Sequence, residues 1–176
     1  MSGVEGMDDN IYGVPYYYDK WLKIDTSTET ISLVGNDLSK YGSGKYNGGV
    51  IGEDCNIYAI PKDANQIIKF NTTTQEVSEV GNRHNGDTKW SGGVLHPNGY
   101  IYCAPYANNK VLKIKTNYIR DEGNSLLKSD ASLTEFNRYL NTYQFEYINV
   151  THKALYDRLV SYRNKLIIDI AKLALE

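Results

Sequence analysis

One segment of the sequence occurs three times, and this recurrence constrains the fold more than any other feature. The copies span residues 2–16, 46–62 and 90–106 and read SGVEGMDDNIYGVPY, YNGGVIGEDCNIYAIPK and WSGGVLHPNGYIYCAPY. Their Ile-Tyr pairs lie 46 and 44 residues apart, and a proline follows each pair at the same distance: Pro15, Pro61 and Pro105. Anchors that recur at two nearly equal spacings indicate a duplicated structural unit.

Each unit has the pattern of four short strands. In the third copy, Gly92–Leu95 is small and apolar, a Pro-Asn-Gly turn follows, Tyr100–Ala104 is aromatic and β-branched, and Val111–Lys115 alternates apolar and charged residues. Such alternation between Gly, Pro and Asn clusters is typical of strands. The fourth strands of the first two units are predicted at residues 30–34 and 76–80, and that of the third, together with its Gly-Asn turn, at 118–124. The repeats are therefore predicted at about 2–45, 46–89 and 90–124.

The sequence resembles the broad group of propeller-like repeat proteins that carry Gly-Gly-Val, Asn-Gly-x-Ile-Tyr and x-Pro-Tyr anchors in each unit. The resemblance covers residues 2 to about 124 and implies a fold, not an activity. Three units are fewer than the roughly four to eight blades of a closed propeller. We expect a mainly β, incomplete propeller-like stack whose open edges need covering. The chain could also be a fragment or a shortened gene product, or two chains could complete one ring of six repeats.

The pattern changes to a helical one in residues 125–176, which we predict to be a tail of two amphipathic helices. Ser132 and Glu135 match a capping box at the start of the first helix. Apolar residues then recur every three or four positions, and a second apolar stripe begins near Thr151. No glycine or proline enforces a break between the two, so a single helix stays open. We favour docking of the tail within the chain over a coiled-coil dimer, because the second stripe is broader than a heptad seam.

Charge and cysteine content exclude several classes of function. A net charge of −2 argues against nucleic acid as the main partner. The sequence has no membrane-spanning run and no signal peptide at its start, so we predict no membrane partner and a cytoplasmic location. Cys55 and Cys103 occupy different positions in the repeat, which predicts two separate buried or half-buried thiols.

Strand order predicts where candidate binding residues gather. In a four-stranded up-and-down unit, the segment that enters the first strand and the loop between the second and third strands lie at one end of the sheet. We call this end the loop rim and expect a recognition surface there. Its candidate residues are Tyr16, Tyr17, Lys20, Lys45, Tyr46, Lys62, Asp63, Lys89, Trp90, Tyr106 and Asn109. The alternative is that Tyr16, Tyr46 and Trp90 pack between repeats, as repeated aromatic residues usually do.

No catalytic motif or metal-ligand spacing occurs in the sequence, and His84, His96 and His152 share no position in the repeat. We therefore predict no catalytic residue, no metal and no cofactor. The leading hypothesis is a non-enzymatic binding or scaffold module for a protein or small molecule. One alternative is a metal-assisted hydrolase or lyase of propeller type that is completed by oligomerisation. Another is a structural homo-oligomer that assembles through its β edges or its helical tail.

Overall fold

A computed structural model describes residues 2–116, 125, 132–142 and 153–173 of the chain. The chain divides into two compact units, Met1–Thr116 and Asn117–Glu176. The first unit is formed by β-strands with one short 3-10 helix, η1 (Ser39–Tyr41), and the second contains two described α-helices. The predicted fold class, mainly β with a C-terminal helical tail, is confirmed.

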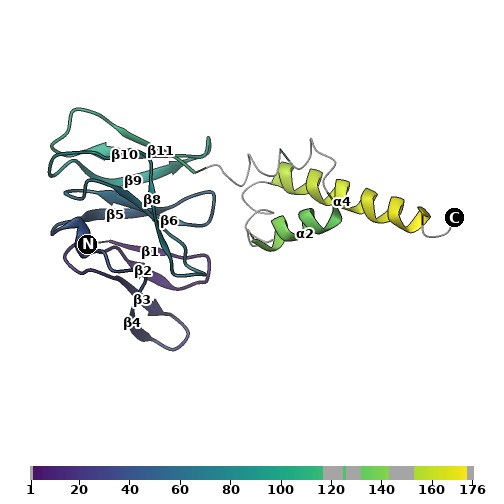
Figure 1. Ribbon diagram of the computed structural model, residues 1–176, viewed down its shortest axis with the longest axis horizontal. Coiled ribbons are helices and arrows are strands. Elements are labelled where there is room, and N and C mark those ends of the chain that lie inside the picture. The colour runs from purple at the N-terminus through teal and green to yellow at the C-terminus, as the bar shows by residue number, and fades with distance from the viewer. Residues whose placement is uncertain (1, 117–124, 126–131, 143–152, 174–176) are drawn as a thin grey trace. The chain divides into compact units, whose positions relative to one another are not determined.

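The first unit consists of three antiparallel sheets, each with its strands in chain order (Figure 1). The first sheet contains β1 (Gly3–Glu5), β2 (Ile11–Gly13), β3 (Trp21–Asp25) and β4 (Thr30–Val34). The second contains β5 (Tyr46–Ile51), β6 (Ile57–Pro61), β7 (Ile67–Phe70) and β8 (Val77–Val80). The third contains β9 (Trp90–His96), β10 (Tyr100–Pro105) and β11 (Leu112–Lys115). The predicted fourth strand of the third repeat, residues 118–124, lies outside the described residues.

The tight turns between strands need backbone conformations with positive φ at repeated positions. In the turn before the second strand of each sheet these positions are Asp9, Cys55 and Gly99, with φ of 60°, 63° and 82°. Aspartate tolerates this left-handed region, and glycine adopts it without steric cost. Cys55 is thus a turn residue with a half-buried thiol, whereas Cys103 lies buried in β10. Neither cysteine forms a disulfide bond, as the sequence predicts.

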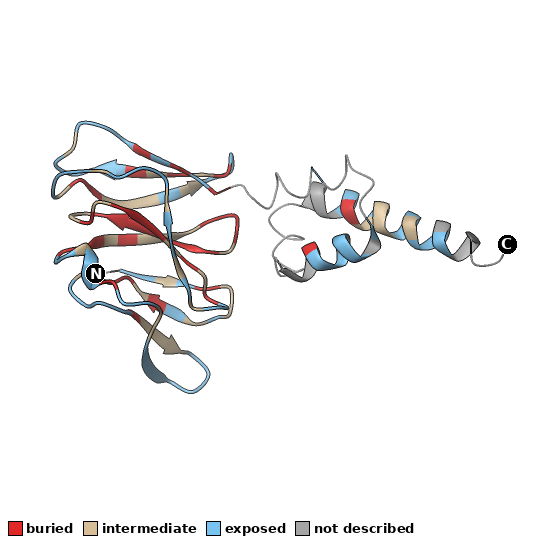
Figure 2. Cartoon of the chain, in the orientation of Figure 1, coloured by how far each residue is buried: buried red, intermediate tan, exposed pale blue. Residues whose placement is uncertain are grey.

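The core lies between consecutive sheets rather than around a single centre. One cluster joins the first and second sheets, where the rings of Trp21 and Phe70 stack with centroids 4.6 Å apart and planes inclined by 18°. The other joins the second and third sheets and includes Tyr58, Ile101 and Ile114. The second sheet is therefore covered on both faces, and every residue of β6 is buried (Figure 2).

Glycines allow the first strands of neighbouring sheets to lie very close together. A Cβ atom added to Gly48 of β5 would lie only 3.0 Å from the Cα atom of Gly92 of β9, and Gly48 has a φ of 99°. Beside this contact the Asn47 side-chain amide donates a hydrogen bond of 3.0 Å to the Ser91 hydroxyl. The small residues of the first strands thus permit a backbone approach that larger side chains would block.

The second unit contains α2 (Leu133–Thr142) and α4 (Lys153–Leu173), which contact each other. The predicted capping box is present at the start of α2, where the Ser132 amide donates to the Glu135 carboxylate at 2.7 Å and the Glu135 amide donates to the Ser132 hydroxyl at 3.3 Å. Tyr139 of α2 and Leu159 of α4 are buried. The predicted break between the helices falls in residues 143–152, outside the described part. Docking of the tail on the β repeats stays a prediction.

Neither described helix combines the length and apolar character needed to cross a membrane.

Candidate functional site

A line of backbone hydrogen bonds runs along the loop rim and connects all three sheets. The amide of Lys45 donates to the carbonyl of Tyr16 (2.9 Å), and the amide of Lys62 donates to the carbonyl of Lys45 (2.9 Å). The pattern repeats one sheet further on, where Lys89 donates to Lys62 (3.0 Å) and Tyr106 donates to Lys89 (3.0 Å). These five predicted candidates therefore lie side by side, because the segments that enter the second and third sheets are each hydrogen-bonded to the second-to-third-strand loops of two sheets.

A compact group of charged side chains lies between the second and third sheets on this rim. The Lys62 ammonium contacts the Asp63 carboxylate at 2.6 Å and lies 5.4 Å from the centre of the Tyr16 ring. The other oxygen of Asp63 accepts a hydrogen bond of 2.6 Å from the Thr88 amide. Burial raises the pKa of the Asp63 carboxyl, but the bonds from Lys62 and Thr88 hold it below its ordinary value overall. Asp63 is consequently ionised at neutral pH, and it joins the loop between β6 and β7 to the loop between β8 and β9, which contains Thr88.

Two of the candidate lysines are buried and fix loop backbone. The Lys45 ammonium forms an ion pair with Asp19 at 2.7 Å and donates to the carbonyls of Tyr17 (3.2 Å) and Tyr18 (3.3 Å). Lys89 donates to the carbonyl of Gly86. Burial lowers the pKa of Lys89. The ammonium groups of Lys45 and Lys89 donate to acceptors inside the protein. These two lysines would therefore affect recognition by fixing the shape of the loops rather than by touching a partner.

The predicted candidates divide clearly by exposure. Tyr46 and Trp90 lie in the inter-sheet core, where the Trp90 indole donates to the Lys110 carbonyl at 2.8 Å, so the packing alternative holds for them. Tyr16 is half-buried. The candidates with exposed side chains are Tyr17, Lys20, Tyr106 and Asn109, and Lys62 and Asp63 are half-buried. Tyr18, absent from the predicted set, is exposed beside Tyr17.

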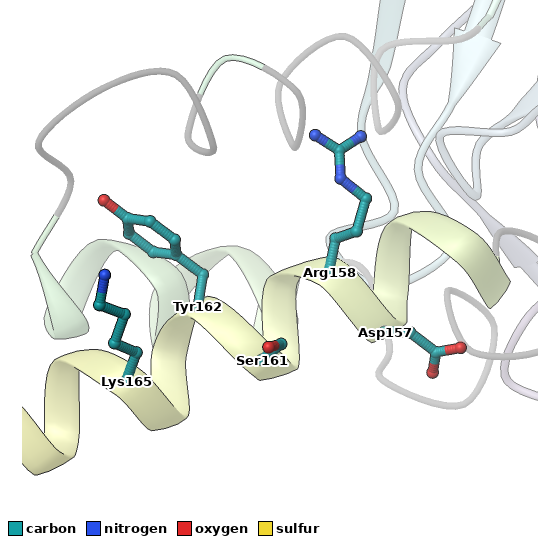
Figure 3. Close-up of a pocket in the computed structure, with 5 residues that line it drawn as sticks. All are labelled: Asp157, Arg158, Ser161, Tyr162 and Lys165. Carbon is teal, nitrogen blue, oxygen red and sulfur yellow. The ribbon is translucent and has the colours of Figure 1, made fainter.

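A cavity of about 600 Å³ extends from the rim over one face of the first sheet. Tyr16, Tyr18 and Lys20 line it at the rim, and Ile11, Leu22, Ile24 and Leu33 are among the apolar residues that line it on the sheet. A second hollow, of about 450 Å³, lies beside α4. There Arg158, Tyr162 and Lys165 project from the same side of the helix (Figure 3). This second hollow contains no residue of the predicted set.

A repeated polar contact was missed by the sequence analysis. The Tyr12 and Tyr58 hydroxyls each donate at 2.9 Å to the carboxylate of the aspartate four residues earlier, Asp8 or Asp54. A lysine eleven residues after each tyrosine approaches the same carboxylate, at 3.9 Å for Lys23 and 3.5 Å for Lys69. The third repeat replaces the aspartate by Asn98, whose amide donates to the Tyr102 hydroxyl at 3.1 Å. The constant spacings from aspartate to tyrosine to lysine in the first two repeats could have revealed this contact.

This repeated contact is structural in the first two repeats, because it lies under the following sheet. Burial, together with the neighbouring Asp54 charge, raises the pKa of Tyr58. Burial and the hydrogen bond to Asp8 raise the pKa of Tyr12. Both phenols are therefore neutral donors at any physiological pH. In the described part of the chain, no three His, Cys, Asp or Glu side chains are grouped as a metal site would require.

Comparison with known proteins shows the fold of the β unit. The sequence matches no protein-family model and no curated protein sequence. Solved structures that it resembles include a catalytically inactive variant of virginiamycin B lyase from Staphylococcus aureus with quinupristin, with a TM-score of 0.55 and 16% identity over 65% of this chain and 37% of that one. A streptogramin B lyase structure gives a TM-score of 0.50 and 14% identity over 65% of this chain and 40% of that one. The β unit is propeller-like, and the chain spans less than half the length of these structures.

Proposed function

We propose that the chain is a non-enzymatic binding module whose loop rim recognises a protein partner. The observation that carries this proposal is the hydrogen-bonded line that joins Tyr16, Lys62 and Tyr106 across three sheets. It places exposed tyrosines on a surface whose backbone is fixed by internal hydrogen bonds. Such a surface loses little conformational entropy on binding, and tyrosine is enriched among the residues that dominate interface energies.

The side chains available for contact are those that the rim leaves in solvent. Tyr17 and Tyr106 are 68% and 73% exposed. Lys20, which follows Tyr17 closely in the same loop, is also exposed and lines the cavity that opens from the rim. Lys62 and Asp63 neutralise each other, so the centre of the surface carries little net charge. We therefore expect recognition through aromatic packing and hydrogen bonds rather than through attraction of a strongly charged partner.

The test uses a library of random linear peptides displayed on phage and selected on the purified full-length chain. Peptides from the selection are synthesised, and their dissociation constants are measured by isothermal titration calorimetry. Tyr17→Ser and Tyr106→Ser should each weaken binding by about tenfold or more, as expected when an interface tyrosine worth ~1.4 kcal/mol or more is lost.

The matched control is Ile167→Ser, which removes an exposed apolar side chain from α4 and leaves Tyr17 and Tyr106 unchanged. Peptides that bind the parent chain should retain their affinity for this variant within about twofold. Selected peptides that tolerate both tyrosine substitutions, or that lose affinity only with Ile167→Ser, would refute the rim as the recognition surface.

A second candidate is a metal-assisted lyase or hydrolase of propeller type that is completed by oligomerisation. The observation that favours it is that the similar solved structures are lyases that share the fold. The described residues of one chain hold no group of metal-ligating side chains, so this function needs residues from a second chain or from beyond the described part. Incubation of the full-length chain with quinupristin and added divalent cations, followed by mass spectrometry, tests it. Turnover would favour the enzyme over the binding module.

A further inference from the structure

The contact between neighbouring sheets is made twice within the chain, each time between the same two kinds of face. One kind, which we call the tyrosine face, presents Tyr12 and Trp21 in the first sheet and Tyr58 in the second. The other, the aliphatic face, presents Ile57 and Phe70 in the second sheet and the equivalent Ile101 and Ile114 in the third. Each internal contact places a tyrosine face on the aliphatic face of the following sheet.

The aliphatic face of the first sheet has no sheet of the β unit on it. Its central row pairs Ile11 with Ile24 across β2 and β3, and Ile24 with Ile31 across β3 and β4. Ile11 is 39% exposed, whereas the equivalent Ile57 and Ile101 are fully buried. The cavity of about 600 Å³ lies over this face. The face thus has the residues of an inter-sheet contact without the opposing sheet.

The tyrosine face of the third sheet is the complementary surface at the other end of the stack. Val94 is 72% exposed, although the equivalent Val4 and Val50 pack against the two core clusters. Tyr102 is only half-buried, whereas Tyr12 and Tyr58 are buried. The Lys113 ammonium lies 5.7 Å from the centre of the Tyr102 ring. Tyr102 and Lys113 of this face are equivalent to the tyrosine and lysine of the two tyrosine faces that are covered within the chain.

We propose that two copies of the chain associate head to tail, with the aliphatic face of the first sheet of each copy against the tyrosine face of the third sheet of the other. The internal contacts show that these two kinds of face fit together, so a second copy offers each end the surface it lacks. Two such contacts close a ring of six sheets, within the range of about four to eight blades found in propellers. This proposal goes beyond the binding role of the loop rim and uses different residues.

The contact between copies differs from the internal contacts at one turn. In the second sheet, the Glu53 amide donates to the Thr116 hydroxyl of the third at 3.2 Å, and a Cβ atom on Gly52 would lie 2.9 Å from the Thr116 Cβ atom. The equivalent positions of the third sheet are His96 and Pro97. Proline has no amide hydrogen to donate, and His96 carries the Cβ atom that the close approach excludes. We therefore expect the contact between copies to be looser at this turn and the dimer to dissociate on dilution.

The experiment measures the mass of the full-length chain by analytical ultracentrifugation over a range of concentrations. The expected result is a reversible equilibrium between one and two chains. Ile11→Asp, on the aliphatic face, and Val94→Asp, on the tyrosine face, should each shift the dissociation constant upward by about 100-fold or more, because a carboxylate would be buried without a partner. Ile11→Thr and Val94→Thr are the milder variants, with a smaller shift in the same direction. Circular dichroism checks that every variant is folded.

Mixing the two aspartate variants distinguishes head-to-tail contact from the other arrangements. Each mixed pair retains one intact contact, between the unchanged first sheet of the Val94→Asp chain and the unchanged third sheet of the Ile11→Asp chain. We expect the mixture to associate more strongly than either variant alone. Ile168→Asp, at an exposed position of α4, is the control and should leave the parent equilibrium unchanged.

Three results would overturn the proposal. The first is a monomer at all concentrations, which would leave the end faces to the tail helices or to solvent. The second is a dimer that Ile11→Asp disrupts but Val94→Asp does not, with no recovery on mixing, because that pattern indicates contact between two first sheets. The third is a dimer that is lost only with Ile168→Asp, which would assign assembly to the tail.

Discussion

Removal of the Asp54 carboxylate should destabilise the β unit far more than removal of its counterpart in the third repeat. Asp54 is 5% exposed and accepts hydrogen bonds from the Tyr58 hydroxyl at 2.9 Å and the Asn56 amide at 2.8 Å. In Asp54→Ala the buried Tyr58 hydroxyl is left without this acceptor. The counterpart, Asn98, is exposed, and water can replace its contacts when it is changed to alanine.

The expected loss for Asp54→Ala follows from these contacts. A hydrogen bond to a charged acceptor contributes about 1.5–3 kcal/mol and a neutral one about 1 kcal/mol. The Lys69 ammonium, 3.5 Å away on a side chain that is 33% exposed, adds less than about 1 kcal/mol. Since removal of the carboxylate also relieves its own desolvation, we expect a loss of about 2–3 kcal/mol in the free energy of unfolding. Asn98→Ala should cost less than about 1 kcal/mol.

Urea unfolding followed by tryptophan fluorescence measures this difference. Both tryptophans of the chain, Trp21 and Trp90, lie in β-strands, so the signal reports on the β unit rather than on the helices. The slope of the unfolding free energy against urea should be unchanged in both variants. Equal losses for Asp54→Ala and Asn98→Ala would show that burial under the next sheet adds nothing to the contact, and the reasoning would fail.

Three further predictions concern the inter-sheet glycines, acid stability and the thiols. Gly48→Ala should lower the free energy of unfolding, measured in urea, by at least about 1 kcal/mol more than Gly86→Ala does. The angle φ is similar at the two residues (99° and 96°), but of the two only Gly48 faces another backbone within 4 Å. Equal losses of unfolding free energy would rule out the close approach. Hydrogen bonds from neighbouring hydroxyl and amide groups lower the pKa of Asp25 from 3.8 to about 2, so its stabilising contribution is complete above pH 3.8 and is lost as the pH falls through about 2. In Asp25→Asn, the free energy of unfolding should therefore change less with pH across that window. If its pH dependence is the same as in the parent chain, the acid sensitivity belongs to other carboxyls. Burial raises the pKa of both Cys55 and Cys103 to about 12, so maleimide labelling at pH 8 should be slow in the native chain and fast in urea; rapid native labelling would contradict their burial.

The sequence alone determined the local elements and their order. The spacing of the Ile-Tyr pairs predicted three repeats, and alternation predicted their strands, because a strand's pattern is set by which side chains face the core. Ser132 with Glu135 located the start of a helix. All of these features depend on residues that are close in sequence or repeated at a fixed interval.

Only the tertiary structure decided which residues are available for contact. The sequence treated Tyr16, Tyr46 and Trp90 as equivalent candidates, yet Tyr46 and Trp90 are in the core and Tyr16 is half-buried. Likewise, the buried ammonium of Lys45 forms an ion pair with Asp19, which lies far earlier in the chain, in the loop between β2 and β3. Burial is set by neighbours that are distant in sequence, and a repeat pattern does not specify them.

The three equivalent isoleucines show this limit most directly. Ile11, Ile57 and Ile101 occupy the same position in the repeat and the same position in their sheets. Ile57 and Ile101 are fully buried, because a preceding sheet of the chain covers their face, whereas Ile11 remains 39% exposed. An identical residue in an identical local setting thus has a different environment, because the number of sheets in the stack determines which faces are covered.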